Sequence, residues 1–157
     1  MDASIINPFI NATLNVLKTM ARLEPVPEKP YLKKTNETWG SVTGLIGLAG
    51  AKANGCMTIS FDEPTALAVV NALLMEKFEK ISDEVVDAIG EITNMICGGA
   101  KAELDNVGYQ FNLAIPSVIV GEKVEMKQLS KSPIIVVPFK LPMGSFAVES
   151  NLTVTKG

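Results

Sequence analysis

The polar residues whose types and spacing could do chemistry fall on one stretch of the chain. At about 100° per residue, five positions share one side of a helix: Asp87, Glu91, Asn94, Gly98 and Lys101. We call these five residues the polar ridge. The opposite side of this helix is apolar and is predicted to face the core; it carries Val85, Ile89, Ile92, Ile96 and Ala100.

The chain contains no histidine. This absence removes imidazole metal ligands, Ser–His and Cys–His nucleophile pairs and the usual general base at neutral pH. Cys56 and Cys97 form no C-x-x-C pair, so neither a metal cage nor a redox motif is predicted, and both are expected to be buried thiols. Any chemistry must therefore use carboxylates, amides, lysines or groups that a partner supplies.

Two glycines within the helix bear on the interpretation of the polar ridge. A polar face alone is typical of any amphipathic helix, and an E-x-x-N pair occurs by chance in many proteins. A glycine inside a helix, however, costs about 1 kcal/mol relative to alanine. Gly98 lies one turn beyond Asn94, so we expect a partner surface to approach the backbone there and Asn94 to enter a cleft. Gly99 has the alternative role of close helix packing.

The segment 87–99, with the sequence DAIGEITNMICGG, resembles the motif of the CheC/CheX/FliY phosphatases. In that family an acidic or serine residue, a glutamate and an asparagine have this spacing along a long helix. Pro116 stands where the family pattern has a downstream proline. Over essentially its whole length the chain is similar to the CheX-like form, which has one such motif where CheC has two.

The resemblance implies a phosphatase that hydrolyses the aspartyl phosphate of a response-regulator receiver domain, which is CheY in chemotaxis. Glu91 would pair with the active-site lysine of the receiver, and Asn94 would orient the attacking water. Asp87, Gly98 and Lys101 would contact the partner, with helix support as the alternative role of Asp87 and a solvated lysine as that of Lys101. The chain would need no cofactor, because Mg²⁺ would belong to the receiver.

The residue types agree with this division of labour. An acyl phosphate is already a high-energy species, so the missing element is a water held in line rather than a strong base. Asparagine is neutral and offers an acceptor and donors from one planar group. A glutamate one turn earlier would improve orientation and encounter more than affinity.

Two other classes of function remain open at this point. A non-catalytic module would dock on a receiver or a flagellar-switch component and sequester it; switch relatives share the fold but lack the Glu and Asn pair. A small-molecule-binding domain would have a concave apolar pocket and would be indifferent to changes at Glu91 and Asn94. The presence of both residues favours the enzyme.

The elements that must position the polar ridge form an α+β domain, with helices layered on a mostly antiparallel sheet. The helices are predicted over about 6–20, with Asn7-Pro8 as cap and first turn, over 62–75 and, as the long helix, over 82–106. An antiparallel hairpin is predicted over 39–61, with Asn54-Gly55 before its second strand, and further strands over 113–120, 133–139 and 146–154. Prolines at 25, 27 and 30 predict an extended connection.

Composition limits the class of protein. The 157 residues are 47% apolar, which fits one compact domain, and the resemblance implies that residues 1–157 form a single CheX-like phosphatase domain. The net charge of −3 and the lack of a basic block disfavour nucleic-acid binding. No apolar run is long enough for a membrane span and no signal peptide is recognised, so a cytoplasmic protein is expected. The resemblance also implies a homodimer formed through the sheets, and exposed β-branched edges such as Ile134–Val137 would allow such pairing, although the sequence does not identify the edge strand.

Overall fold

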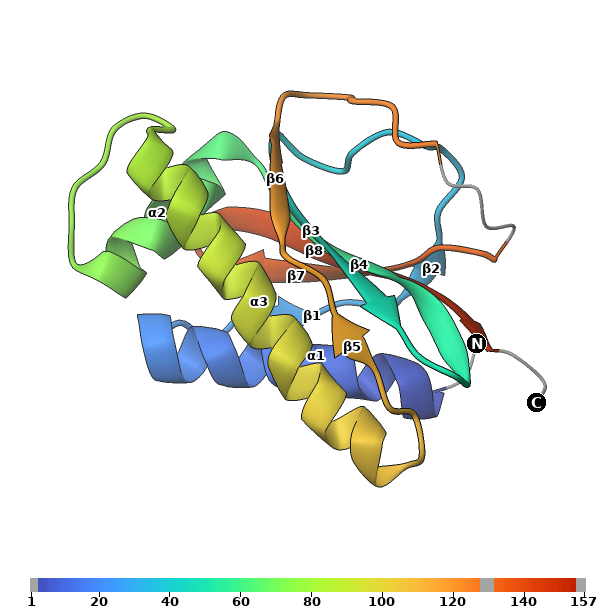
Figure 1. Ribbon diagram of the computed structural model, residues 1–157. Coiled ribbons are helices and arrows are strands. Elements are labelled where there is room, and N and C mark those ends of the chain that lie inside the picture. Colours follow the sequence, from blue (N-terminus) through green and yellow to red (C-terminus); the bar gives the residue numbers. More distant parts are fainter. Residues whose placement is uncertain (1–2, 128–131, 155–157) are drawn as a thin grey trace.

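The computed structural model describes residues 3–127 and 132–154. Within them, three helices pack on one face of an eight-stranded antiparallel sheet, as Figure 1 shows. The helices are α1 Ala3–Ala21, α2 Glu63–Leu74 and α3 Asp83–Asn106. The strands are β1 Val26–Pro27, β2 Tyr31–Leu32, β3 Val42–Ala49, β4 Ala53–Phe61, β5 Asn112–Leu113, β6 Ser117–Val120, β7 Ile135–Leu141 and β8 Gly144–Val154. The predicted α+β class is confirmed.

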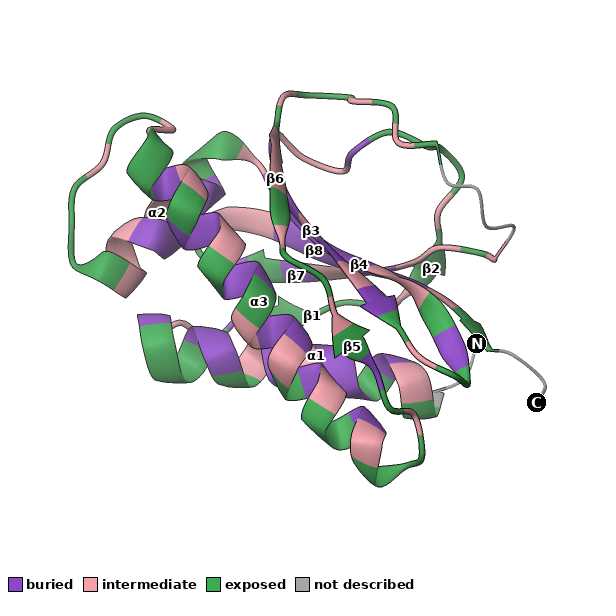
Figure 2. Cartoon of the chain, viewed as in Figure 1, coloured by how far each residue is buried: buried purple, intermediate pink, exposed green. Residues whose placement is uncertain are grey.

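The sheet has the order β1-β7-β8-β4-β3-β5, with β2 also paired to β7 and β6 also paired to β3. Alternate residues of its central strands face the helices, and Figure 2 shows the buried stripes where the two layers meet. Three phenylalanine rings stack at the centre of this core: Phe146 lies 5.2 Å from Phe61 and 4.9 Å from Phe139 between ring centroids. The core lies between the sheet and the helices.

The ends of the helices follow from short polar signals in the sequence. The side chain of Asp62 accepts a hydrogen bond from the Thr65 backbone N–H, and Ser82 accepts one from the N–H of Val85, so α2 and α3 begin where they were predicted to begin. The predicted first helix is present as α1, but its predicted start at Asn7-Pro8 was wrong, because the helix starts at Ala3 and contains Pro8. Pro8 is buried, and the packing of its ring offsets the backbone hydrogen bond that proline cannot donate.

The hairpin of β3 and β4 forms as predicted, but its turn lies elsewhere. Asn54 and Gly55 belong to β4, where they pair with Ala49 and Leu48, and the chain reverses at residues 50–52. The Asn54 side chain accepts a hydrogen bond from the Gly50 N–H at 3.1 Å and so stabilises that turn. A Cβ atom at Gly55 would clash with the carbonyl oxygen of Asn151 on β8. The glycine therefore serves strand packing rather than the turn.

The segment Ile134–Val137 does not form an exposed edge of the sheet. Its residues from Ile135 onward belong to β7, which is covered by β2 near its start and by β1 near its end. The proline-rich connection, predicted to be extended, supplies these two short strands. The outer strands are therefore β1 and β2 on this side, and β5 and β6 beside β3 on the other.

A buried ion pair fastens the segment after β2 to the sheet. The Lys33 ammonium lies 2.7 Å from the Glu149 carboxylate, and the two side chains are 11% and 6% exposed. Burial raises the pKa of Glu149 above its ordinary value of 4.5, while the hydrogen bond and the charge of Lys33 act to lower it. Lys33 thus stabilises the charged form of the carboxylate against the effect of burial.

Replacing Lys33 with methionine is expected to make stability depend on pH. The change removes both influences that lower the pKa of Glu149, so that pKa rises further in the folded state. A carboxyl group whose folded pKa is raised contributes stability at low pH and loses it as pH rises toward the folded pKa. Relative to wild type, the free energy of unfolding should fall increasingly above about pH 4.5, by about 3 kcal/mol near neutral pH.

Urea unfolding at several pH values measures this effect. The double variant Lys33→Met with Glu149→Gln carries no charge at either position and should lose the pH dependence. A deficit in Lys33→Met that is constant with pH would contradict the role assigned to the pair.

Candidate functional site

Helix α3 presents the polar ridge on its outer side. The five residues of the predicted apolar stripe are fully buried, and the side chains of Asp87, Glu91 and Asn94 are exposed, while Gly98 and Lys101 are half-buried. The predicted orientation of the helix is therefore confirmed. Asn94 follows Glu91 by three residues, so both side chains project from neighbouring turns of the same face.

An open groove runs along the ridge between α3 and β6. Asp87, Glu91 and Asn94 line one wall and Pro116 and Val118 the other, with Val86 and Gly90 between them. A Cβ atom at Gly90 would lie 3.6 Å from the Val118 side chain, which shows how closely the helix and the strand approach each other. The structure thus brings Pro116, which lies over twenty residues downstream, to the same groove as Glu91 and Asn94.

Two close contacts fix the position of α3 on the rest of the fold. Where α3 crosses β3, a Cβ atom at Gly44 would clash with the Thr93 hydroxyl, so only glycine permits this approach. Where α3 crosses α1, a Cβ atom at Gly99 would lie 3.2 Å from that of Ala12. Gly99 therefore has the packing role that was its alternative in the sequence analysis. Such contacts hold the ridge on a rigid element, as a precise site requires.

Gly98 differs from its neighbour. A Cβ atom there would meet no other atom within 4 Å, so no part of the described chain requires a glycine at this position. The space above the Gly98 backbone is open, one turn beyond Asn94 on the same ridge. A partner surface is free to approach the helix there.

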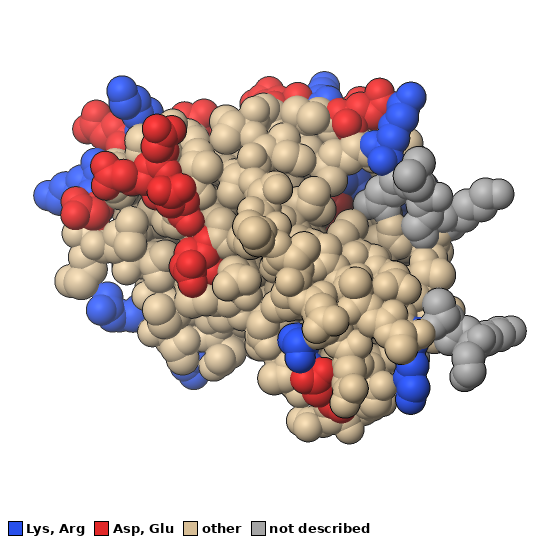
Figure 3. Space-filling view, in the orientation of Figure 1, with Lys and Arg blue, Asp and Glu red and all other residues tan. Residues whose placement is uncertain are grey.

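The N-terminal half of α3 is acidic. It carries no basic residue and four carboxylates, which are Asp83, Glu84, Asp87 and Glu91. Figure 3 shows acidic side chains gathered over this part of the molecule. The positive end of the helix dipole favours negative charge in the first turn. The first basic residue of α3 is Lys101, whose ammonium lies 2.9 Å from the Asp105 carboxylate. The groove therefore offers negative charge to a partner.

The two central side chains of the ridge have no competing contacts. Within the part of the chain that the structure describes, neither the Glu91 nor the Asn94 side chain has a hydrogen bond or an ion pair. An uncommitted carboxylate can pair with an ammonium group, and an uncommitted amide can both donate to and accept from a water molecule. This arrangement suits the binding of a protein surface that carries those groups.

Other groups that could do chemistry are not gathered into a site. Among the described residues, no three His, Cys, Asp or Glu side chains lie so that they could hold a metal ion. Cys97 is buried as expected, and burial, with a smaller effect of Cys56, raises its pKa to about 12. Cys56 is only half-buried, and burial followed by the charge of Glu149 raises its pKa as well. At neutral pH both thiols are protonated.

One residue beside the groove was missed from the sequence. Ile115 is 90% exposed and directly precedes Pro116. The predicted strand over 113–120 is in fact two short strands, β5 and β6, with residues 114–116 between them. The signal that could have shown the break is the X-Pro step within a β-branched run, because proline restricts its predecessor and donates no ladder hydrogen bond.

Comparison with known proteins gives the chain its family. The family described as "Chemotaxis phosphatase CheX" matches residues 42–140, a range that contains the whole polar ridge and Pro116. The chain belongs to the CheX family. It is 30% identical to the CheY-P phosphatase CheX of Thermotoga maritima, and the match covers all of this chain and 99% of that protein.

Solved structures of CheX-type proteins have the same fold. A CheC-like superfamily protein from Shewanella sp. PV-4 superposes with a TM-score of 0.90 at 42% identity, covering 98% of this chain and 99% of that one. The CheX of a CheX-CheY-BeF3-Mg complex from Borrelia burgdorferi superposes with a TM-score of 0.81 at 29% identity, covering 94% of this chain and 97% of that one. None of the helices among the described residues is long and apolar enough to span a membrane.

Proposed function

We propose that this chain hydrolyses the aspartyl phosphate of a CheY-like receiver domain and so terminates a chemotaxis signal in the cytoplasm. One observation carries the proposal: Glu91 and Asn94 stand exposed and uncommitted on neighbouring turns of α3, at the edge of an open groove. A family relative is named a CheY-P phosphatase, and another was solved in complex with CheY, beryllium fluoride and magnesium. Both findings support a receiver as the substrate.

In the proposed mechanism, Glu91 sets the position of the receiver and Asn94 provides the catalytic group. The Glu91 carboxylate pairs with the ammonium group of a lysine beside the receiver's phosphorylation site, which fixes the docking register. The Asn94 side chain then enters that site, and its amide holds a water in line with the phosphorus–oxygen bond to be broken. Because the amide is neutral, it does not repel the phosphoryl oxygens as a carboxylate would.

Positioning suffices for this reaction. The acyl phosphate carries a good leaving group. Holding a water at the correct distance and angle therefore supplies most of the rate enhancement of its hydrolysis. A magnesium ion held by the receiver would supply positive charge to the phosphoryl group, and no residue of this chain is needed to hold it. The residues of this chain orient the attacking water and exclude other water molecules from the docked surface.

The remaining residues of the polar ridge contact the partner in this proposal. Asp87 extends the acidic wall by one turn beyond Glu91 and lines the same groove. The open space above Gly98 receives the partner backbone. Lys101 lies at the far end of the ridge, where its ion pair with Asp105 leaves it one third exposed and within reach of an acidic group on the receiver.

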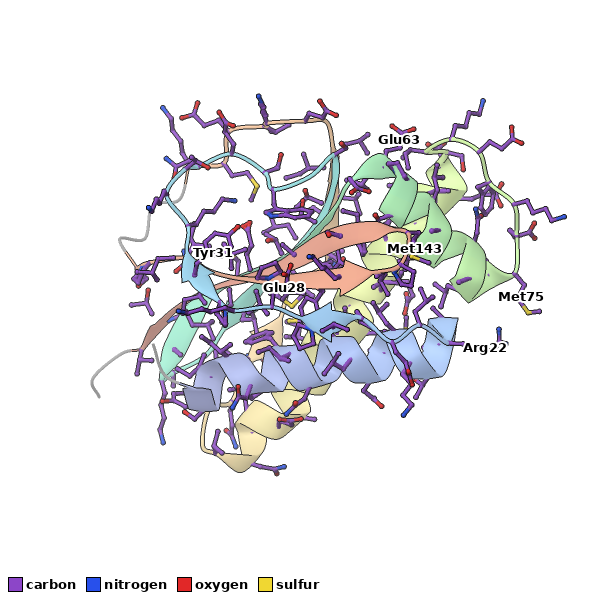
Figure 4. The ribbon with its side chains drawn as sticks, turned by 180° about the vertical axis from the view of Figure 1, so that it is seen from behind. Arg22, Glu28, Tyr31, Glu63, Met75 and Met143 are labelled. Carbon is purple, nitrogen blue, oxygen red and sulfur yellow. The ribbon has the colours of Figure 1, made fainter. Side chains whose placement is uncertain are left out.

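We also propose that the protein forms a homodimer through the β1–β2 side of the sheet. Three large apolar side chains on these outermost strands are substantially exposed: Val26, Tyr31 and Leu32. Figure 4 shows this side from behind, with Glu28 and Tyr31 labelled along it. Unpaired strand edges with apolar side chains favour pairing with another strand.

The non-catalytic alternatives make different predictions. A sequestering module would bind the phosphorylated receiver without accelerating loss of the phosphate. A small-molecule-binding domain would use a concave apolar surface, and an open hollow beside Tyr31, Leu32 and Trp39 is the candidate for it. Asn94 has no catalytic role in a sequestering module, and neither Glu91 nor Asn94 has a role in small-molecule binding, so the presence of both residues favours the enzyme.

The test is the rate at which a magnesium-loaded, phosphorylated CheY loses its acyl phosphate with and without this protein. Faster loss supports the phosphatase. Binding without acceleration would replace the proposal by the sequestering module, and the absence of binding would leave only the fold.

The variant Glu91→Ala is expected to lower kcat/KM for the phosphorylated receiver by about 10- to 100-fold, because it leaves the receiver lysine without its partner in the docked complex. Steady-state phosphate release measures this loss. Glu84→Ala removes a carboxylate that lies outside the groove and serves as the matched control, with an expected change below about threefold. Equal effects of the two substitutions would mean that only total charge matters.

A further inference from the structure

The outer strand beside β3 contains one extra residue next to the groove. Leu113 pairs with Leu48, and Ser117 pairs with Leu45. Between these pairs β3 has two residues, Ile46 and Gly47, whereas the segment that joins β5 to β6 has three, at positions 114–116. One more residue on one strand than on its partner is a β-bulge, a device that redirects a side chain and is frequent beside active sites.

The bulge directs Ile115 into solvent. The Ala114 N–H donates to the Gly47 carbonyl at 3.0 Å, which keeps Ala114 against β3. Pro116 lies in the wall of the groove with Glu91 and Asn94. Ile115, between Ala114 and Pro116 in the chain, is 90% exposed, the highest value among the large apolar side chains of the described residues.

The backbone around Ile115 is held in place. The hydrogen bond of Ala114 fixes one side, and the β6 ladder with β3 begins at Ser117 on the other. Proline at 116 confines the backbone of Ile115 to the extended region. The side chain is thus presented by a preorganised segment, so its burial in a complex would order little additional chain.

We propose that Ile115 is the apolar anchor by which this surface seats on the receiver domain, inserting into an apolar recess beside the lysine that Glu91 meets. This inference rests on the proposed function, because the receiver is the occupant of the adjoining groove. The acidic wall and the apolar rim are continuous through Pro116, and together they fit a partner that presents an ammonium group next to an apolar depression. The apolar contact supplies affinity, and the charge pair supplies register.

The binding test uses a CheY receiver domain of the same organism in its magnesium- and beryllofluoride-bound form, titrated calorimetrically. Ile115→Ala is expected to weaken the Kd by about tenfold or more, and Ile115→Leu to restore most of the affinity. Met75→Ala is the matched control, since Met75 is 76% exposed and lies at the far end of α2, pointing outward in Figure 4. Its Kd should match that of wild type.

The kinetic test separates the anchor from the chemistry. In the phosphate-release assay Ile115→Ala should raise KM about tenfold at unchanged kcat, and its melting temperature should equal that of wild type because Ile115 makes little contact within the fold. Wild-type affinity in Ile115→Ala would overturn the anchor while leaving the phosphatase intact. Reduced affinity in Ile115→Ala, in a protein that does not accelerate phosphate loss, would support the anchor and overturn the phosphatase. The absence of any binding by wild type would overturn both.

Discussion

Replacing Asn94 with alanine is expected to reduce the stimulated loss of acyl phosphate by at least about 100-fold, which returns the receiver to its own rate. In the proposed mechanism the amide is the group that holds the attacking water, and a misplaced nucleophile alone costs about 100-fold in well-organised sites. The methyl group of alanine can neither donate to nor accept from that water. Release of phosphate in single-turnover reactions measures the effect.

The same substitution should leave the fold intact and slightly more stable. The Asn94 side chain is exposed and has no hydrogen bond within the described residues, and alanine is the better helix former by about 0.5 kcal/mol. Affinity for the beryllofluoride form of the receiver should change by less than about threefold. Asn106→Ala, at the exposed C-terminal end of α3, is the matched control and should retain full activity.

Two outcomes would contradict this assignment. Retained activity in Asn94→Ala would remove the amide from the mechanism and leave Glu91 as a docking residue without a catalytic partner. A large loss of stability would mean that Asn94 lies on a packed face of the helix, contrary to its exposure in the structure. An activity loss with nearly unchanged affinity and no loss of stability is the combination that only a catalytic role explains.

The helix that carries the site was predictable because its determinants are local. The cap at Ser82 and the apolar stripe from Val85 onward lie within the helix or directly before it, and the 3.6-residue period alone separates buried from exposed positions. The orientation of Glu91 and Asn94 toward solvent followed from that period. Their isolation from competing partners did not, since it depends on what the rest of the chain places nearby.

The predictions that failed depended on contacts between distant segments. Asn54-Gly55 is a strong hairpin signal, yet Gly55 is needed where β8 passes close to β4, and a local turn signal does not report that contact. The edge predicted over 134–137 is covered by strands from the other end of the chain. Pairing of that kind is set by the whole sheet, and a single strand sequence does not encode its neighbours.

The second wall of the groove shows the same limit within the site. Pro116 was expected near the helix only through the resemblance to the family, whereas the bulge that displays Ile115 depends on the count of residues between two pairs along β3. A one-residue difference in a ladder has no periodic pattern by which to find it. The register of the sheet, once known, reveals it directly.

The largest effect outside Asn94 is expected at Gly98, where stability and activity should change in opposite directions. A Cβ atom at this position meets nothing within 4 Å, so Gly98→Ala should raise the free energy of unfolding by about 0.5–1 kcal/mol. Gly98→Leu should gain a similar free energy of unfolding in urea titrations, because leucine is also a better helix former than glycine. The leucine side chain would fill the open space on the ridge and should lower kcat/KM by about 100-fold, because it holds the receiver away from Asn94.

The adjacent glycine provides the contrast that makes this result interpretable. Gly99 faces Ala12 of α1, and Gly99→Leu should lose stability because the larger side chain separates the two helices. If Gly98→Leu were as active as wild type, the partner would not approach the helix at this turn, and the reason for a glycine there would disappear. Suppose instead that Gly98→Leu is more stable than wild type and no longer stimulates phosphate release. The glycine then destabilises the free helix by about 1 kcal/mol and is required because a partner surface approaches the backbone there in the complex.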